Sequence, residues 1–125
     1  MSIRRQTQTI LPSAARTATV VSPVFSAEQV LSSIFIVNVT ATSATPSVVL
    51  SIEGKDPISG SFYNIIDSAA ITITGTATIQ VGHNIIAAAN VAANEMLPAE
   101  FRVTATHGDA DSITYSLSVV HLVQI

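Results

Sequence analysis

The chain has 125 residues, of which 48% are hydrophobic and 10% charged, with a formal net charge of −3 and no cysteine. This length fits one domain with an ordinary core, and the lack of cysteine excludes disulfides and thiolate metal sites. Five basic residues are too few for the positive stripe of a nucleic-acid interface, and no apolar run approaches the ~18–20 residues of a membrane span. The sequence therefore predicts neither a nucleic-acid nor a membrane partner.

The low content of charged residues is the first indication of function. Soluble proteins are typically ~25% charged, and a charged surface keeps them in solution. A chain with so few charges must either cover much of its surface with other subunits or stay soluble through neutral Ser and Thr hydroxyls. The first alternative makes the chain an assembly subunit; the second remains open.

Residues 1–12 show little periodicity, and we expect them to form an N-terminal arm attached to a domain at residues 13–125. Arg4 and Arg5, with Arg16, form the main basic concentration, and Ile10 and Leu11 add apolar contacts, so these five are the candidate partner-contact residues. We expect removal of residues 1–12 to weaken attachment to a partner without unfolding the domain. No apolar stretch follows Arg5, so we expect no signal peptide and synthesis in the cytoplasm.

The composition predicts an all-β fold. Ile and Val together number 29 while Leu numbers six, and branching at Cβ suits a pleated strand. Period-two alternation predicts strands at residues 14–21, 33–42, 47–53, 61–66, 70–74, 76–81, 100–107 and 112–124. Residues 82–98 are ambiguous between strand, a helical turn and loop. Seven or eight strands at this spacing predict a single-domain two-sheet β-sandwich, jelly-roll or immunoglobulin-like, with the strand order left open.

Three segments carry more specific predictions. The strand at 33–42 is apolar on both faces, which predicts burial on both sides, inside a sandwich or under a partner. The turn formers of residues 54–60 predict a hairpin between the strands on either side. Residues 108–111 predict a second hairpin, joining the last two strands.

Candidate catalytic and metal chemistry is sparse. Asp109 and Asp111 are weak candidates for calcium, because two local carboxylates fall short of the six to eight oxygens that the ion requires; a turn held by Asp side chains is the simpler interpretation. Hydroxyls are abundant, but no Gly-x-Ser-x-Gly elbow occurs, and His121 falls among Val and Leu on an inward face. Glycine-rich phosphate loops are also absent. We therefore predict no enzyme activity and no cofactor.

Two blocks of the sequence resemble small proteins encoded in the structural gene clusters of tailed bacteriophages. The first is residues 52–60 with the following Phe62-Tyr63-Asn64-Ile65. The second begins at Asn90-Val91-Ala92, continues through residues 97–103 and ends in residues 107–116. The resemblance extends from about Arg16 to the C-terminus, although Phe101 stands where the relatives often have Trp.

This resemblance implies a virion protein and, by analogy, a β-sandwich that decorates or cements a capsid, often as a trimer. Its partner would then be the major capsid protein. A ring-forming tail or neck component is the alternative, and a receptor- or glycan-binding virion domain is a further one. No catalytic residue is transferred by the resemblance.

Overall fold

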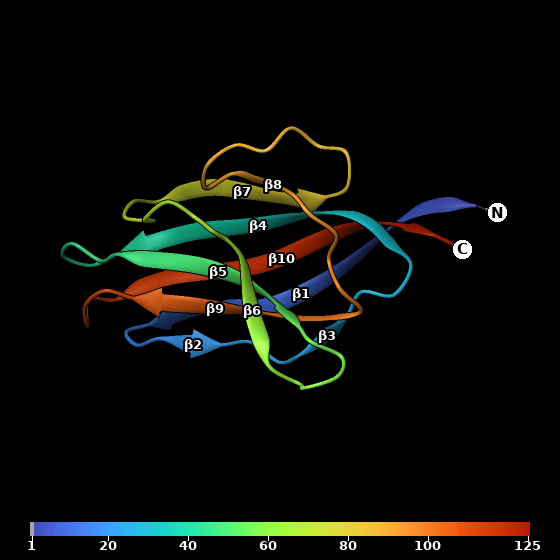
Figure 1. The fold of residues 1–125 in the computed structure, drawn as a ribbon. Helices are drawn as coiled ribbons and strands as arrows, with labels where there is room; N and C mark the ends of the chain where they lie inside the picture. The colour runs from blue at the N-terminus through green and yellow to red at the C-terminus, as the bar shows by residue number, and fades with distance from the viewer. Residues whose placement is uncertain (1) are drawn as a thin grey trace.

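The computed structural model describes residues 2–125, and these form strands and loops with no helix, so none that could cross a membrane. The strands are β1 (Ile3–Arg16), β2 (Val20–Val21), β3 (Phe25–Ser26), β4 (Val30–Thr42), β5 (Val48–Lys55), β6 (Phe62–Asp67), β7 (Gly75–Gly82), β8 (Ala92–Asn94), β9 (Glu100–His107) and β10 (Ile113–Gln124). They make two sheets packed face to face (Figure 1). The predicted all-β sandwich is confirmed.

The strand order identifies the kind of sandwich. Sheet A has the order β1-β10-β4-β7-β8, and sheet B has the order β2-β9-β5-β6, with β3 also pairing with β9. The antiparallel pairs are nested along the chain: β5 with β6, then β4 with β7, then β2 and β3 with β9, and finally β1 with β10. A long hairpin of nested pairs rolled into two sheets is a jelly roll. Of the two architectures left open above, the order selects this one.

Alternation along the central strands builds the core. Every second residue of β10, from Ile113 to Val123, is buried, and the same holds for β5 from Val48 to Gly54. Phe101, on β9, lies between the sheets: its ring is 5.7 Å from that of Phe35 on β4 and 5.9 Å from that of Phe25 on β3 (centroid distances). Apolar burial on this scale is the main stabilising term of the fold.

The predicted arm is the largest error of the sequence analysis. Residues 3–16 form β1, which pairs with β10 from Ile3 to Arg16 as the edge strand of sheet A. Ile10 and Leu11 are 2% and 5% exposed and belong to the core. The periodicity was obscured by two bulges, between Thr9 and Leu11 and between Leu11 and Ala14, which shift the alternation twice within one strand.

Two other predicted segments are corrected, and the structure resolves a third whose conformation was left open. Residues 14–21 are not one strand, because the chain leaves sheet A after Arg16 and enters sheet B at Val20. Residues 70–74 form a loop held by a single bridge between Ile71 and Val48. Residues 82–98 contain no helical turn: they make a loop and the short strand β8, which pairs in parallel with β7.

The two predicted hairpins have different outcomes. Residues 54–60 do connect β5 and β6 as an antiparallel pair, with the turn held by the Asp56 carboxylate, which accepts from the Ile58 N–H at 2.9 Å. Residues 108–111 do not form a hairpin, since β9 belongs to sheet B and β10 to sheet A. The turn residues mark a change of direction equally well in both cases; only the sheet into which the chain returns differs.

Candidate interaction surfaces

Ionised side chains are divided unevenly between the two sheets. In sheet A, strands β4, β7, β8 and β10 contain no Asp, Glu, Lys or Arg, and its charges are confined to the edge strand β1. In sheet B, charged residues lie on all three of the longer strands, β5, β6 and β9. The outward face of sheet A is therefore neutral in its centre, while that of sheet B is charged.

Four of the five charged residues on the strands of sheet B form two ion pairs. Arg102 Nε donates to Glu53 Oε1 at 2.8 Å, and the hydroxyl of Thr104 donates to the same oxygen at 2.9 Å. The Arg102 guanidinium also lies 3.7 Å from the centroid of the Phe62 ring, a cation–π contact. Lys55 Nζ lies 3.7 Å from Glu100 Oε1. This face has the internal ion pairs and solvated groups of an ordinary exposed surface.

The outward face of sheet A carries an apolar strip bordered by hydroxyls. Register places Val120 of β10 beside Ile34 of β4, and Ser118 beside Ile36. Leu122 lies next along β10, and both Ile34 and Leu122 are 37% exposed. On either side, Thr7 pairs with Val120 and Thr78 with Ile36. We call the surface formed by Ile34, Ile36, Val120 and Leu122, with Thr7 and Thr78 at its borders, the neutral face.

The neutral face bears on the prediction that residues 33–42 are buried on both sides. The strand at 33–42 was predicted to be buried on both sides, inside a sandwich or under a partner. Within this chain only one side is buried, the side of Phe35, Val37 and Val39. On the other side, no element formed by residues 2–125 covers Ile34 and Ile36.

The five predicted contact residues do not form one site. Arg16 lies at the opposite end of β1 from Arg4 and Arg5, and its guanidinium lies 4.5 Å from the centroid of the Tyr115 ring. It also donates to the Tyr115 carbonyl at 2.6 Å. Ile10 and Leu11 are in the core, so of the five only Arg4 and Arg5 offer exposed side chains.

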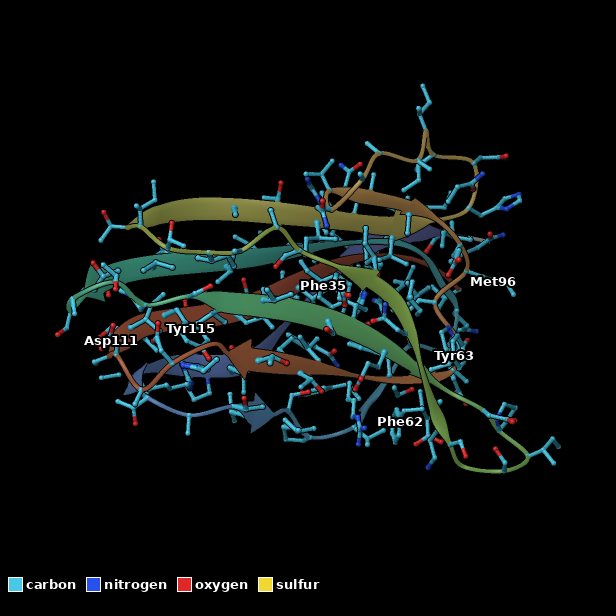
Figure 2. All side chains as sticks on the ribbon, turned by 60° about the vertical axis from the view of Figure 1, so that its left-hand side comes forward. Phe35, Phe62, Tyr63, Met96, Asp111 and Tyr115 are labelled. Atoms are coloured by element: carbon cyan, nitrogen blue, oxygen red, sulfur yellow. The ribbon has the colours of Figure 1, made fainter. Side chains whose placement is uncertain are left out.

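The acidic residues of the loop after β9 hold that loop together. Asp109 Oδ1 accepts from the Asp111 N–H at 3.0 Å, and Asp111 Oδ2 accepts from the Thr45 N–H at 3.1 Å. Among the residues described, no group of three or more His, Asp or Glu comes close enough to hold a metal ion. The carboxylates act here as turn residues that fasten one end of the sandwich, where Figure 2 shows Asp111 near Tyr115.

One serine and one histidine meet inside the sandwich. Ser33 Oγ is 2.7 Å from His121 Nδ1, and Gln8 Oε1 is 3.4 Å from His121 Nε2. The two residues of the closer pair are 2% and 1% exposed, and the imidazole packs edge-on against the Phe101 ring. A substrate cannot reach this pair without unfolding the sheet, so the contact serves packing.

Burial of His121 makes stability depend on pH. Desolvation lowers the pKa of His121 below its ordinary value of 6.5, so the unfolded chain takes up the proton first as the pH falls. The contribution of the neutral imidazole is fully present above pH ~6.5 and is lost below it, with a slope of at most ~1.4 kcal/mol per pH unit. Burial also lowers the pKa of His107, with a smaller part from Arg16.

We therefore expect the midpoint temperature of thermal unfolding to decrease as the pH is lowered from 7.5 to 5. His121→Gln should make this decrease smaller. Thermal unfolding followed by circular dichroism at half-unit pH steps measures both effects. His83→Gln is the matched control, because His83 is exposed. If H121Q and H83Q have parallel pH profiles, the buried imidazole is not the source of the dependence.

A cleft of about 360 Å³ opens between the sheets beside β7. Its walls come from β4, β7, the loop at 68–74 and Val91, and none of the lining residues has an ionisable side chain. Its Ser and Thr hydroxyls therefore have no acid or base among the lining residues to activate them. The other exposed apolar side chains are scattered over strands and loops, and Figure 2 shows Tyr63 and Met96 at the end opposite Asp111.

The neutral face was not predicted from the sequence. Its signal was present in the apolar residues at alternate positions of two strands, Ile34 with Ile36 and Val120 with Leu122. Recognising it required the knowledge that β4 and β10 are neighbours, which the strand order alone supplies.

Comparison with known proteins finds a similarity in structure and none in sequence. No protein-family model and no curated protein matches the chain. Among solved structures, a chain in the structure of infectious bursal disease virus, Gx strain, is similar with 13% sequence identity and a TM-score of 0.47. The similarity covers 97% of this chain and 32% of the viral one, so this chain spans about a third of that chain's length.

Proposed function

We propose that this protein is a non-enzymatic structural subunit of a virus particle, and that it decorates and cements the shell by docking its neutral face on the major capsid protein. The observation that supports this most directly is the segregation of charge. An exposed sheet face whose central strands β10 and β4 carry no ionised group, with four apolar side chains along them and Arg5 of β1 at its border, favours contact with another protein surface.

The neutral face has the size that such a contact requires. At ~3.3 Å per residue and ~4.8 Å per strand, four strands about a dozen residues long present roughly 700 Å². A stable protein interface buries about 800 Å² on each partner. A subunit that binds only the assembled shell stabilises it by mass action, and many copies add their contributions.

Two alternative functions compete with this proposal. A tail or neck component would use the neutral face to form a ring about the tail axis. Electron microscopy of the particle separates this role from decoration of the shell by the position of the density.

A glycan-binding domain would instead need aromatic platforms. Tyr63 is 46% exposed, whereas Phe62 lies under Arg102, so one ring alone is available for stacking on a sugar, and this alternative is weaker.

The test is a charge introduced on each face in turn. Ile34→Lys places an ammonium group in the centre of the neutral face, and we expect the number of copies per purified particle to fall at least about tenfold, because burying an unpaired charge costs more than the ~1.4 kcal/mol that this factor represents. Val49→Lys, on the outward face of sheet B, is the matched control and should leave the copy number unchanged. Equal occupancy for both variants, measured by quantitative mass spectrometry, would contradict the proposal.

A further inference from the structure

The free edge of β1 is open over one half and closed over the other. From Ile10 onward the strand is bulged, Pro12 has no N–H to offer, and the Arg16 guanidinium donates to the carbonyls of Pro12 and Ala14. Bulges, proline and capped carbonyls are the means by which proteins prevent a sheet edge from pairing. From Ile3 to Thr9 the register with β10 is continuous, with no bulge and no proline.

The backbone groups that face outward along this open half can be identified. Ser2 and Ile125 exchange both backbone hydrogen bonds, N to O at 2.8 and 2.9 Å. In an antiparallel pair such residues alternate with ones whose N–H and C=O point away. The outward groups therefore belong to four residues of β1, namely Ile3, Arg5, Thr7 and Thr9. β1 pairs with β10 alone, and Figure 1 shows it at the border of its sheet.

We propose that this edge pairs with the same edge of a second copy, antiparallel about a two-fold axis at Gln6. In this register Ile3 faces Thr9 of the second copy and Arg5 faces Thr7. All four outward residues are then used, and the four symmetric pairs would exchange about eight hydrogen bonds. The two copies would share one continuous ten-stranded sheet. This inference is independent of the virion role.

Charge repulsion and the bulge at Leu11 favour this register over those with the two-fold axis at Arg5 or at Thr7. A two-fold axis at Arg5 would place that arginine opposite its own copy, and like charges directly opposite one another are destabilising. An axis at Thr7 would bring Ile3 against the bulge at Leu11. With the axis at Gln6, Arg4 faces Gln8 and Arg5 faces Thr7, so each guanidinium meets a neutral hydrogen-bonding side chain. The edge is self-complementary, as an isologous interface must be. The pair differs from the trimer that the sequence resemblance implied.

Cysteine cross-linking tests the register directly, because the chain has no cysteine of its own. Gln6 would face its own copy in a non-hydrogen-bonded pair, with a Cα separation of ~4.5 Å that a disulfide can span. Under mild oxidation Gln6→Cys is expected to convert most of the protein to a covalent species of twice the 13.0 kDa chain mass. Gln8→Cys, the matched control, would face Arg4 of the second copy and should remain largely monomeric on a denaturing gel. Equal cross-linking of the two variants would overturn the register.

Two further substitutions keep the proposal testable without a disulfide. Thr7→Lys places a second cation opposite Arg5 of the second copy and should weaken the dimer, whereas Thr7→Glu should form two ion pairs across the axis and strengthen it. Sedimentation equilibrium over a range of concentrations measures both, with circular dichroism showing that the fold is retained. A mass of 13.0 kDa for the wild-type chain at every concentration, a trimer mass, or the same association constant for T7K and T7E would overturn the dimer.

Discussion

Replacing Phe101 with alanine is expected to lower the free energy of unfolding by about 3–5 kcal/mol, the usual range for a fully buried phenylalanine. Phe101 is 0% exposed and belongs to sheet B, yet its ring contacts Phe35 and His121 of sheet A and Phe25 of β3. The cavity would therefore open between the sheets, where neighbouring side chains on two rigid surfaces have little freedom to collapse.

Urea denaturation followed by circular dichroism measures this loss as a shift in the midpoint. Phe62→Ala is the matched control, because Phe62 lies on the outward side of β6 and is only half-buried. Removing it takes away the stacking partner of Arg102, and we expect a loss below about 1.5 kcal/mol. Similar losses for the two variants would show that Phe101 does not join the sheets.

The central strands were predictable because their alternation is uninterrupted. Residues 100–107 were predicted as a strand, with Phe101, Val103 and Ala105 on one face, and β9 has these bounds and these buried residues. The same reasoning succeeded for β5 and β10, whose alternation places Val48 and Ile113 inward. A strand with one face in the core has apolar residues at every second position, and this period is visible in the sequence.

The predictions failed where the alternation of apolar and polar residues was interrupted, and where the result depended on which strand pairs with which. Pro12 and the two bulges of β1 removed the alternation from a strand of 14 residues. The loop at 108–111 has the residues of a hairpin, yet it connects different sheets. Turn chemistry reports that the chain reverses, and it contains no information on which sheet receives the next strand.

The candidate surface was predictable only in part. Low charge indicated a docking protein, and the apolar residues on both faces of β4 indicated a partner. Four of the five predicted contact residues lie in the supposed arm, because a terminus without periodicity resembles a free segment. The structure leaves Arg4 and Arg5 exposed at the open edge of β1, and it exposes the apolar side chains of Ile34 and Leu122 on the neutral face.

Removal of residues 2–12, with Met1 kept as the start, is expected to unfold the domain rather than merely detach it from a partner. Ile10 and Leu11 would be lost from the core, at ~1.5–3 kcal/mol for each buried side chain. The outer edge of β10, which β1 covers from Ile3 to Arg16, would also be exposed. A loss of roughly 3–6 kcal/mol is a large part of the 5–15 kcal/mol typical of a domain.

The matched control is removal of residues 2–5 alone, which are exposed and leave Ile10 and Leu11 in place. We expect this shorter deletion to retain a cooperative unfolding transition close to that of the full chain. The longer deletion should show none, or one shifted to much lower urea. If both deletions unfold at the midpoint of the full chain, β1 is dispensable and behaves as the arm that its irregular sequence suggests. The contrast decides whether the first strand is part of the core or an accessory to it, because the two deletions differ in whether they remove the only two buried side chains of β1.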